Sequence, residues 1–140
     1  MSIKKFNSEG YYDPTTYEAM TAVEKEEMAL RAFRPIVYIC SPYAGDVEAN
    51  VSAAQKYSRF AVDKHYLPIA PHIYFTQFMD DDIPEERDTA IFMNWVLMSK
   101  CVELWVFGEN ISAGMKAEID RAKRKHMRIR YFTEELEEKL

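Results

Sequence analysis

Long apolar runs are missing from the sequence: no stretch of its 140 residues approaches the roughly 18 apolar residues that span a bilayer. The N-terminus carries Lys4 and Lys5 but lacks the apolar region of a secretory signal. Only two cysteines occur, Cys40 and Cys101, each in or beside an apolar run where cysteine usually acts as a small buried hydrophobe. Neither a disulfide nor a metal site is required. We therefore expect a cytoplasmic protein without a membrane partner.

An excess of positive charge is also missing. The formal net charge is −5, which gives no electrostatic footprint for duplex nucleic acid. One basic cluster, Lys116 with residues 121–125, is more typical of a solvated helix face than of a binding patch. The sequence has no metal-ligand spacing, no P-loop and no G-x-G-x-x-G after its first apolar run. We expect no cofactor and no duplex nucleic-acid partner.

What remains is the composition of an ordinary globular protein, with 48% hydrophobic and 29% charged residues in a chain long enough for one core. Residues 1–34 are predicted to form a polar lead and a helix. Asp13 is its expected N-cap and Pro14 its first residue, and the helix is expected to run to about Ala32. It should end there because Pro35 pushes Arg34 out of the helical region. Residues 35–140 are predicted to form an α/β domain.

Within that domain, apolar runs alternate with helical patterns. Strands are predicted at 36–40, 66–72, 102–107 and 127–132, helices at 47–65, 84–100 and 113–125, an aromatic loop at 73–82, and a short terminal helix from Thr133. This order predicts a doubly wound, Rossmann- or flavodoxin-like fold with a mainly parallel sheet of four to five strands. Right-handed crossovers put the switch point between the first and third strands. Ligands of such sheets bind there, at the carboxyl ends of the strands.

The turn after the third strand holds the main candidate site. Ser112 is placed to cap the following helix, and its hydroxyl with the N–H groups of Gly114 and Met115 suits a phosphate. Glu118 lies at the edge of that helix's apolar stripe, and its side chain should lean back over Gly114, so it is a candidate nucleophile. The alternative is that Ser112 only caps the helix and that Glu118 only pairs with Arg121 on a wet face.

A resemblance rests on the segment Ser112-Ala113-Gly114-Met115-Lys116-Ala117-Glu118, on the strand before it at 103–108, and on Tyr38-Ile39-Cys40-Ser41-Pro42. Together these resemble the nucleoside 2-deoxyribosyltransferase family over about residues 35–132. They are most similar to the branch that includes nucleoside 5′-monophosphate N-glycosidases. The resemblance implies cleavage of an N-glycosidic bond by a carboxylate that attacks the anomeric carbon, with water or a second base completing the reaction. It also implies a homo-oligomer.

The resemblance implies residue roles as well. Glu118 matches the family's nucleophile, and Ser112 occupies a position that is typically Asp in members that handle nucleosides and Ser in members that bind a 5′-phosphate. The substrate implied is thus a nucleoside monophosphate and the acceptor is water. The family's acid toward the leaving base aligns with Asn94, which can form a hydrogen bond but cannot donate a titrating proton. Asp88 is the alternative acid, and Arg87 shares a face with Asn94 as a ligand or subunit contact.

The loops after the first two strands supply further candidates. Tyr43 is predicted to orient Glu118 or to stack on the base, while Ser41 and Gly45 would contact the ligand, the glycine by letting backbone approach it. His72 is expected at the end of the second strand as a base contact. The alternatives are a plain strand-to-helix connection for the first loop and ordinary surface polarity for His72.

Three functions remain open from the sequence. The leading interpretation is a hydrolase, or a transferase, that cleaves the N-glycosidic bond of a nucleotide or nucleoside through Glu118. The second is a nucleotide-binding or regulatory module of the same fold that does not turn its ligand over, an alternative that Asn94 keeps open. The third is an accessory protein that acts through its N-terminal helix. Release of free base by the protein distinguishes the first function from the second.

Overall fold

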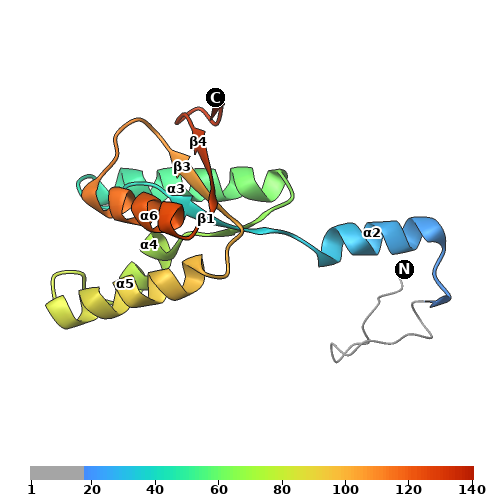
Figure 1. Ribbon diagram of the computed structural model, residues 1–140, viewed down its shortest axis with the longest axis horizontal. Helices are drawn as coiled ribbons and strands as arrows, with labels where there is room; N and C mark the ends of the chain where they lie inside the picture. Colours follow the sequence, from blue (N-terminus) through green and yellow to red (C-terminus); the bar gives the residue numbers. More distant parts are fainter. Residues whose placement is uncertain (1–17) are drawn as a thin grey trace. The chain divides into compact units, whose positions relative to one another are not determined.

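A computed structural model describes residues 18–140 (Figure 1). The predicted helix start at Asp13-Pro14 lies outside these residues. The chain divides into two compact units, Met1–Arg34 and Pro35–Leu140. That residues 35–140 form an independent domain stays a prediction.

In the first unit, helix α2 spans Ala22–Ala32. Its N-cap is Thr21, which is extended and forms a capping box with Glu24: the Thr21 hydroxyl accepts from the Glu24 N–H at 3.2 Å, and the Thr21 N–H donates to the Glu24 carboxylate at 3.3 Å. The prediction of one uninterrupted helix from residue 14 is therefore wrong at Thr21, where this cap starts a new helix. The predicted end is confirmed, because Phe33 is extended two residues before Pro35.

The second unit is built on one five-stranded sheet. Its strands are β1 (Ile36–Cys40), β2 (Leu67–Ile69), β3 (Glu103–Phe107), β4 (Arg128–Phe132) and β5 (Glu138–Lys139). The strand order is β2-β1-β3-β4-β5; the first four strands are parallel, and β5 runs antiparallel to β4. The predicted doubly wound, mainly parallel α/β fold is confirmed. The order reverses between β1 and β3, as predicted.

Helices cover both faces of this sheet (Figure 1). They are α3 (Val47–Asp63), α4 (Pro71–Tyr74), α5 (Pro84–Met98) and α6 (Ala113–Arg124), with a short 3-10 helix, η1 (Phe75–Gln77). Side chains along β1 and β3 point alternately to opposite faces of the sheet, so each strand contributes residues to two hydrophobic cores. One core packs against α5 and α6 and contains Tyr38, Cys40, Leu104, Val106, Met98, Met115, Ile119 and Ala122. The other packs against α3 and contains Val37, Ile39, Trp105, Phe107, Phe132, Tyr57 and Ala61.

Two expectations for the connections are wrong. The segment expected as an aromatic loop begins with α4 and η1, because Pro71 suits the first turn of a helix and ends β2 after three residues. The terminal helix expected from Thr133 is a turn that returns the chain as β5. Its register is held by the ion pair of Arg130 with Glu138, at 2.7 Å. Within residues 18–140, no helix is long and apolar enough to cross a membrane.

Candidate active site

The site lies at the carboxyl ends of β1 and β3. The chain leaves β1 toward α3 and β3 toward α6, which pack on opposite faces of the sheet. After β3, Gly108 adopts a φ of +89°, a left-handed conformation that glycine takes without strain. The chain then reaches Ser112, whose hydroxyl accepts a hydrogen bond from the Met115 N–H at 3.2 Å. The predicted cap is confirmed, and it starts α6 beside the end of β1.

Glu118 lies half-buried on the first turns of α6 and is held by β1. The thiol of Cys40, a fully buried residue, lies 3.7 Å from the Glu118 carboxylate and 3.9 Å from the Met115 carbonyl. A thiol is a weak donor, so it orients the carboxylate without neutralising it. Among the described residues Glu118 makes no ion pair, and Arg121 lies instead over the Trp95 ring at 5.1 Å. The alternative of a surface Glu118–Arg121 pair is therefore wrong.

Tyr38 is a second neighbour of Glu118, one that sequence reasoning missed. Its buried hydroxyl interacts with the Glu118 charge but meets no well-aligned hydrogen-bond partner within residues 18–140. Strand alternation was the available signal, because Tyr38 and Cys40 share the face of β1 that α6 covers. Tyr43, the predicted orienting residue, has no hydrogen bond to Glu118 in the described chain, and its carbonyl accepts from the Asn50 amide at 3.0 Å. Its role stays a prediction.

The buried setting changes the proton affinity of these three side chains. Burial raises the pKa of Glu118 to about 7, although contacts with Tyr38 and Cys40 lower it in part. Burial, reinforced by the Glu118 charge, raises the pKa of Tyr38 and of Cys40 well above their ordinary values. The phenol and the thiol thus stay protonated near neutral pH, while Glu118 gains and loses its proton there.

Ser41 and His72, both predicted ligand contacts, are brought together. The buried Ser41 hydroxyl lies 3.0 Å from His72 Nε2. His72 stands on α4 rather than at a strand end, so its predicted placement is wrong by one element. Burial lowers the pKa of His72 to about 4, so the ring is neutral at physiological pH. A neutral ring offers one donor and one acceptor, which suits recognition of a polar heterocycle.

The glycines and Met115 shape the approach to the site. Gly45 has a φ of +95° and open space where a Cβ would lie. A Cβ on Gly114 would meet only the Ser112 hydroxyl, at 4.0 Å, so the surface beside the cap is open. The Met115 side chain is buried and its N–H already donates to Ser112. A ligand phosphate would therefore have to replace the Ser112 hydroxyl as the acceptor of that N–H.

Three predicted residues lie on α5, and within residues 18–140 none of them forms a hydrogen bond or ion pair with Glu118. Asn94 is partly buried, and its Oδ1 has no hydrogen-bond donor within residues 18–140. Arg87 and Asp88 are exposed and form no ion pair in the described part of the chain. Their roles stay predictions. In the same residues, no group of three or more His, Cys, Asp or Glu is placed to hold a metal ion.

A half-buried carboxylate next to a helix N-terminus, at the switch point of a β2-β1-β3-β4-β5 sheet, defines a doubly wound α/β protein with its candidate ligand site at the strand ends. The chain belongs to the family described as Domain of unknown function (DUF7768), which matches residues 35–132. A search of curated proteins gives no match.

Among solved structures, the chain is similar to a 2-deoxyribosyltransferase from the psychrotolerant bacterium Bacillus psychrosaccharolyticus, described as a biocatalyst for the synthesis of antiviral and antitumoral nucleosides. The TM-score is 0.56 with 16% sequence identity, over 70% of this chain and 72% of that chain. At this identity the similarity establishes the fold, and the resemblance seen in the sequence is confirmed at that level.

The setting of Glu118 makes protein stability depend on pH. Its folded pKa of about 7 exceeds the ordinary 4.5, so between these values the folded state binds more protons than the unfolded state. The contribution of Glu118 to stability is therefore fully present below pH 4.5 and is lost as the pH rises through about 7. Glu118→Gln removes this loss and should raise the free energy of unfolding above pH 7 by on the order of 2 kcal/mol, with little change at pH 4.5.

Urea unfolding across this pH range measures the effect. The matched control is Glu109→Gln, which neutralises an exposed carboxylate in the loop before α6 and should leave the pH profile unchanged. Parallel profiles for the wild type and Glu118→Gln would contradict a raised pKa for Glu118.

Proposed function

We propose that the protein cleaves the N-glycosidic bond of a nucleoside 5′-monophosphate or nucleoside, with Glu118 as the nucleophile. The observation that carries the proposal is the Glu118 carboxylate itself: half-buried at the switch point, oriented by the Cys40 thiol, and ionising near neutral pH. The fold similarity to a 2-deoxyribosyltransferase supports the same class of chemistry.

In the proposed reaction, ionised Glu118 attacks the anomeric carbon through an oxocarbenium-like transition state. The bond to the base nitrogen breaks, and its electron pair leaves with the base, which takes a proton from solvent or from a neighbouring acid. The resulting glycosyl ester on Glu118 is then hydrolysed by water or transferred to a second base. Only the ionised carboxylate can attack, so the rate should rise with pH through about 7.

Binding groups surround this carboxylate in the proposal. Ser41 and His72 would contact the base, as would Tyr43 if its ring stacks there, and Gly45 would let the loop approach the ligand. The open surface at Ser112 and Gly114 supports a 5′-phosphate at the positive end of the α6 dipole, because an anion is stabilised at a helix N-terminus. Arg87 and Asp88 are proposed contacts on the resemblance alone.

A second candidate function is a module that binds a nucleotide without cleaving it. Asn94 favours this second function. By the resemblance, the nucleoside 2-deoxyribosyltransferase family has an acid for the leaving base at this position, where this chain has an amide. The Asn94 Oδ1 has no hydrogen-bond donor within residues 18–140. Such an amide can accept a hydrogen bond from a base but cannot protonate it. Ligand binding without base release would establish this function.

Base release from nucleotides tests the two functions directly. The purified protein is incubated with a panel of ribo- and deoxyribonucleosides and their 5′-monophosphates, and free base is measured by chromatography. We expect release by the wild type and a loss of at least about 100-fold in Glu118→Gln, because the nucleophile is removed. Glu109→Gln is the matched control and should retain full activity. Equal rates for Glu118→Gln and wild type would contradict catalysis by Glu118.

Substrate preference depends in this proposal on Ser112. Ser112→Asp keeps an N-cap acceptor for the Met115 N–H, so the helix should remain folded. Its negative charge repels a phosphate, and we expect kcat/KM for monophosphates to fall by about tenfold or more relative to the parent nucleosides. A melting temperature near that of the wild type serves as the folding control. An unchanged ratio of the two kcat/KM values would contradict a phosphate site at Ser112.

We also propose that the protein is a homo-oligomer that associates through α5. Phe92 and Val96 lie one turn apart on this helix with 66% and 44% of their surfaces exposed. Contiguous exposed apolar surface is typical of protein contacts, and this pair supports such a contact on α5. Light scattering should show a multiple of the 16.4 kDa chain mass, and Phe92→Glu should lower it. A monomeric wild type would contradict the proposal. Gln55→Glu, which adds a negative charge at an exposed position on α3, is the control for added charge away from α5.

A further inference from the structure

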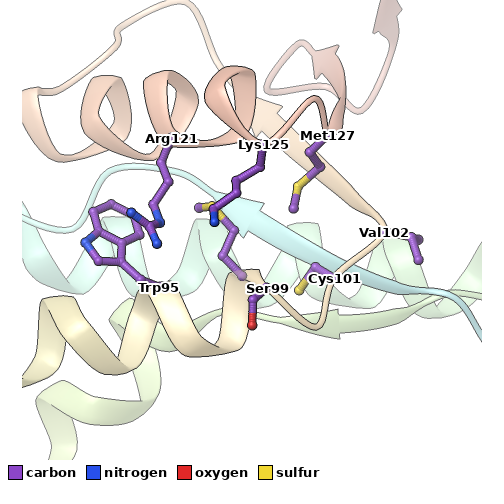
Figure 2. A pocket seen from close by; sticks show the side chains of 8 residues that line it. Trp95, Ser99, Cys101, Val102, Arg121, Lys125 and Met127 are labelled. Carbon is purple, nitrogen blue, oxygen red and sulfur yellow. The ribbon is translucent and has the colours of Figure 1, made fainter.

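A groove of about 350 Å³ lies between the C-terminal halves of α5 and α6. Figure 2 shows Arg121 and Lys125 reaching into it from α6, with Trp95 opposite them on α5. Cys101 and Met127, which precede β3 and β4, also line it, so the groove faces the amino ends of these strands. The Glu118 site lies at their carboxyl ends, and the two are distinct.

The two charged side chains that line the groove, Arg121 and Lys125, are both cationic. The Arg121 guanidinium lies 5.1 Å from the centre of the Trp95 ring. Neither Arg121 nor Lys125 makes an ion pair within residues 18–140, and no Asp or Glu lines the groove. The chain has a net charge of −5, whereas the side chains that line this groove carry only positive charge.

Helix capping does not account for this arrangement. Basic residues are favourable in the last turn of a helix, and α6 has Lys123 and Arg124 there in addition to Arg121. Lys123 and Arg124 are exposed and lie outside the groove lining. Lys123 and Arg124 are placed to interact with the negative end of the α6 dipole. Arg121 and Lys125 are directed across the groove toward α5 (Figure 2).

The remaining wall of the groove is apolar. Trp95 and Met127 are partly buried and Met98 is almost fully buried, so they form a continuous surface beside the two cations. An apolar wall with a few convergent polar groups is the composition of small-molecule sites, and the volume matches the lower end of their range. The Arg121 guanidinium, which already lies over the Trp95 ring, can still form hydrogen bonds to an incoming anion.

We propose that this groove is a second binding site for a small organic anion, one whose phosphate or carboxylate group binds between Arg121 and Lys125 and whose aromatic or aliphatic body packs on Trp95 and Met98. Binding in this groove does not depend on the proposed catalysis by Glu118. It would let an anionic metabolite bind to the same domain without competing for the strand-end site.

Phenyl phosphate is a suitable probe because it carries both parts of the expected ligand. The chain has two tryptophans. Trp95 lines the groove, whereas Trp105 lies in the core on the other face of the sheet, where its Nε1–H donates to Glu103 at 2.8 Å. In ¹H–¹⁵N spectra, phenyl phosphate should shift the Trp95 indole signal saturably and leave that of Trp105 in place.

Charge variants then identify the groups that bind. Arg121→Gln and Lys125→Gln should each weaken phenyl phosphate binding by about tenfold, as expected for loss of a charge-assisted contact. Lys125 is exposed, so its variant tests the site even if Arg121→Gln alters packing. The matched control, Lys123→Gln with Arg124→Gln, removes two charges from the same helix outside the groove and should bind as the wild type does.

Four outcomes would overturn the proposal. A Trp95 signal that does not move shows that no anion binds there. A shift that disappears in Ser112→Ala or Glu118→Gln assigns the probe to the strand-end site. Equal affinity for inorganic phosphate and phenyl phosphate shows a bare cation patch without an apolar subsite. A change in oligomeric mass on adding the probe shows that the groove is a contact between subunits. None of these outcomes depends on whether nucleotides are cleaved.

Discussion

The burial of one carboxylate, Glu118, against the end of strand β1 is the constraint on which the candidate site depends. An isolated buried carboxylate is costly, and the protein accommodates it by shifting its pKa to about 7 and by placing the Cys40 thiol 3.7 Å away. The phenol of Tyr38 adds a polar neighbour that stays protonated. The result is a half-buried acid that remains in part ionised at neutral pH, as a nucleophile toward an anomeric carbon requires.

The sheet makes this burial possible. Strands β1 and β3 are buried on both faces, and α6 packs against them through Met115, Ile119 and Ala122, which places Glu118 beside Cys40. The same helix begins at the Ser112 cap and ends beside the cationic groove. One helix with its N-cap thus carries the proposed nucleophile, the proposed phosphate contact and one wall of a separate binding surface.

Local patterns were sufficient to predict the parts of this structure that depend on neighbouring residues. The β-branched run of β1, the cap at Ser112 and the alternation of strands and helices led to the fold and to its switch point. The incorrect predictions concern features that depend on specific side-chain pairs. The break at Thr21 depends on a reciprocal cap with Glu24, and β5 depends on the pairing of Glu138 with Arg130 across the sheet edge. At the site, Glu118 was identified but its partner was not: strand alternation would have selected Tyr38, whereas the polar loop suggested Tyr43.

The most direct measurement of the central claim is the mass of the protein during turnover of a 2′-fluorinated nucleoside 5′-monophosphate, in which fluorine slows hydrolysis of a glycosyl ester. If Glu118 is the nucleophile, the intact mass rises by that of the fluorinated sugar phosphate after loss of the base, and peptide mapping locates the adduct on Glu118. Base release without an adduct, or an adduct on another residue, would contradict the account.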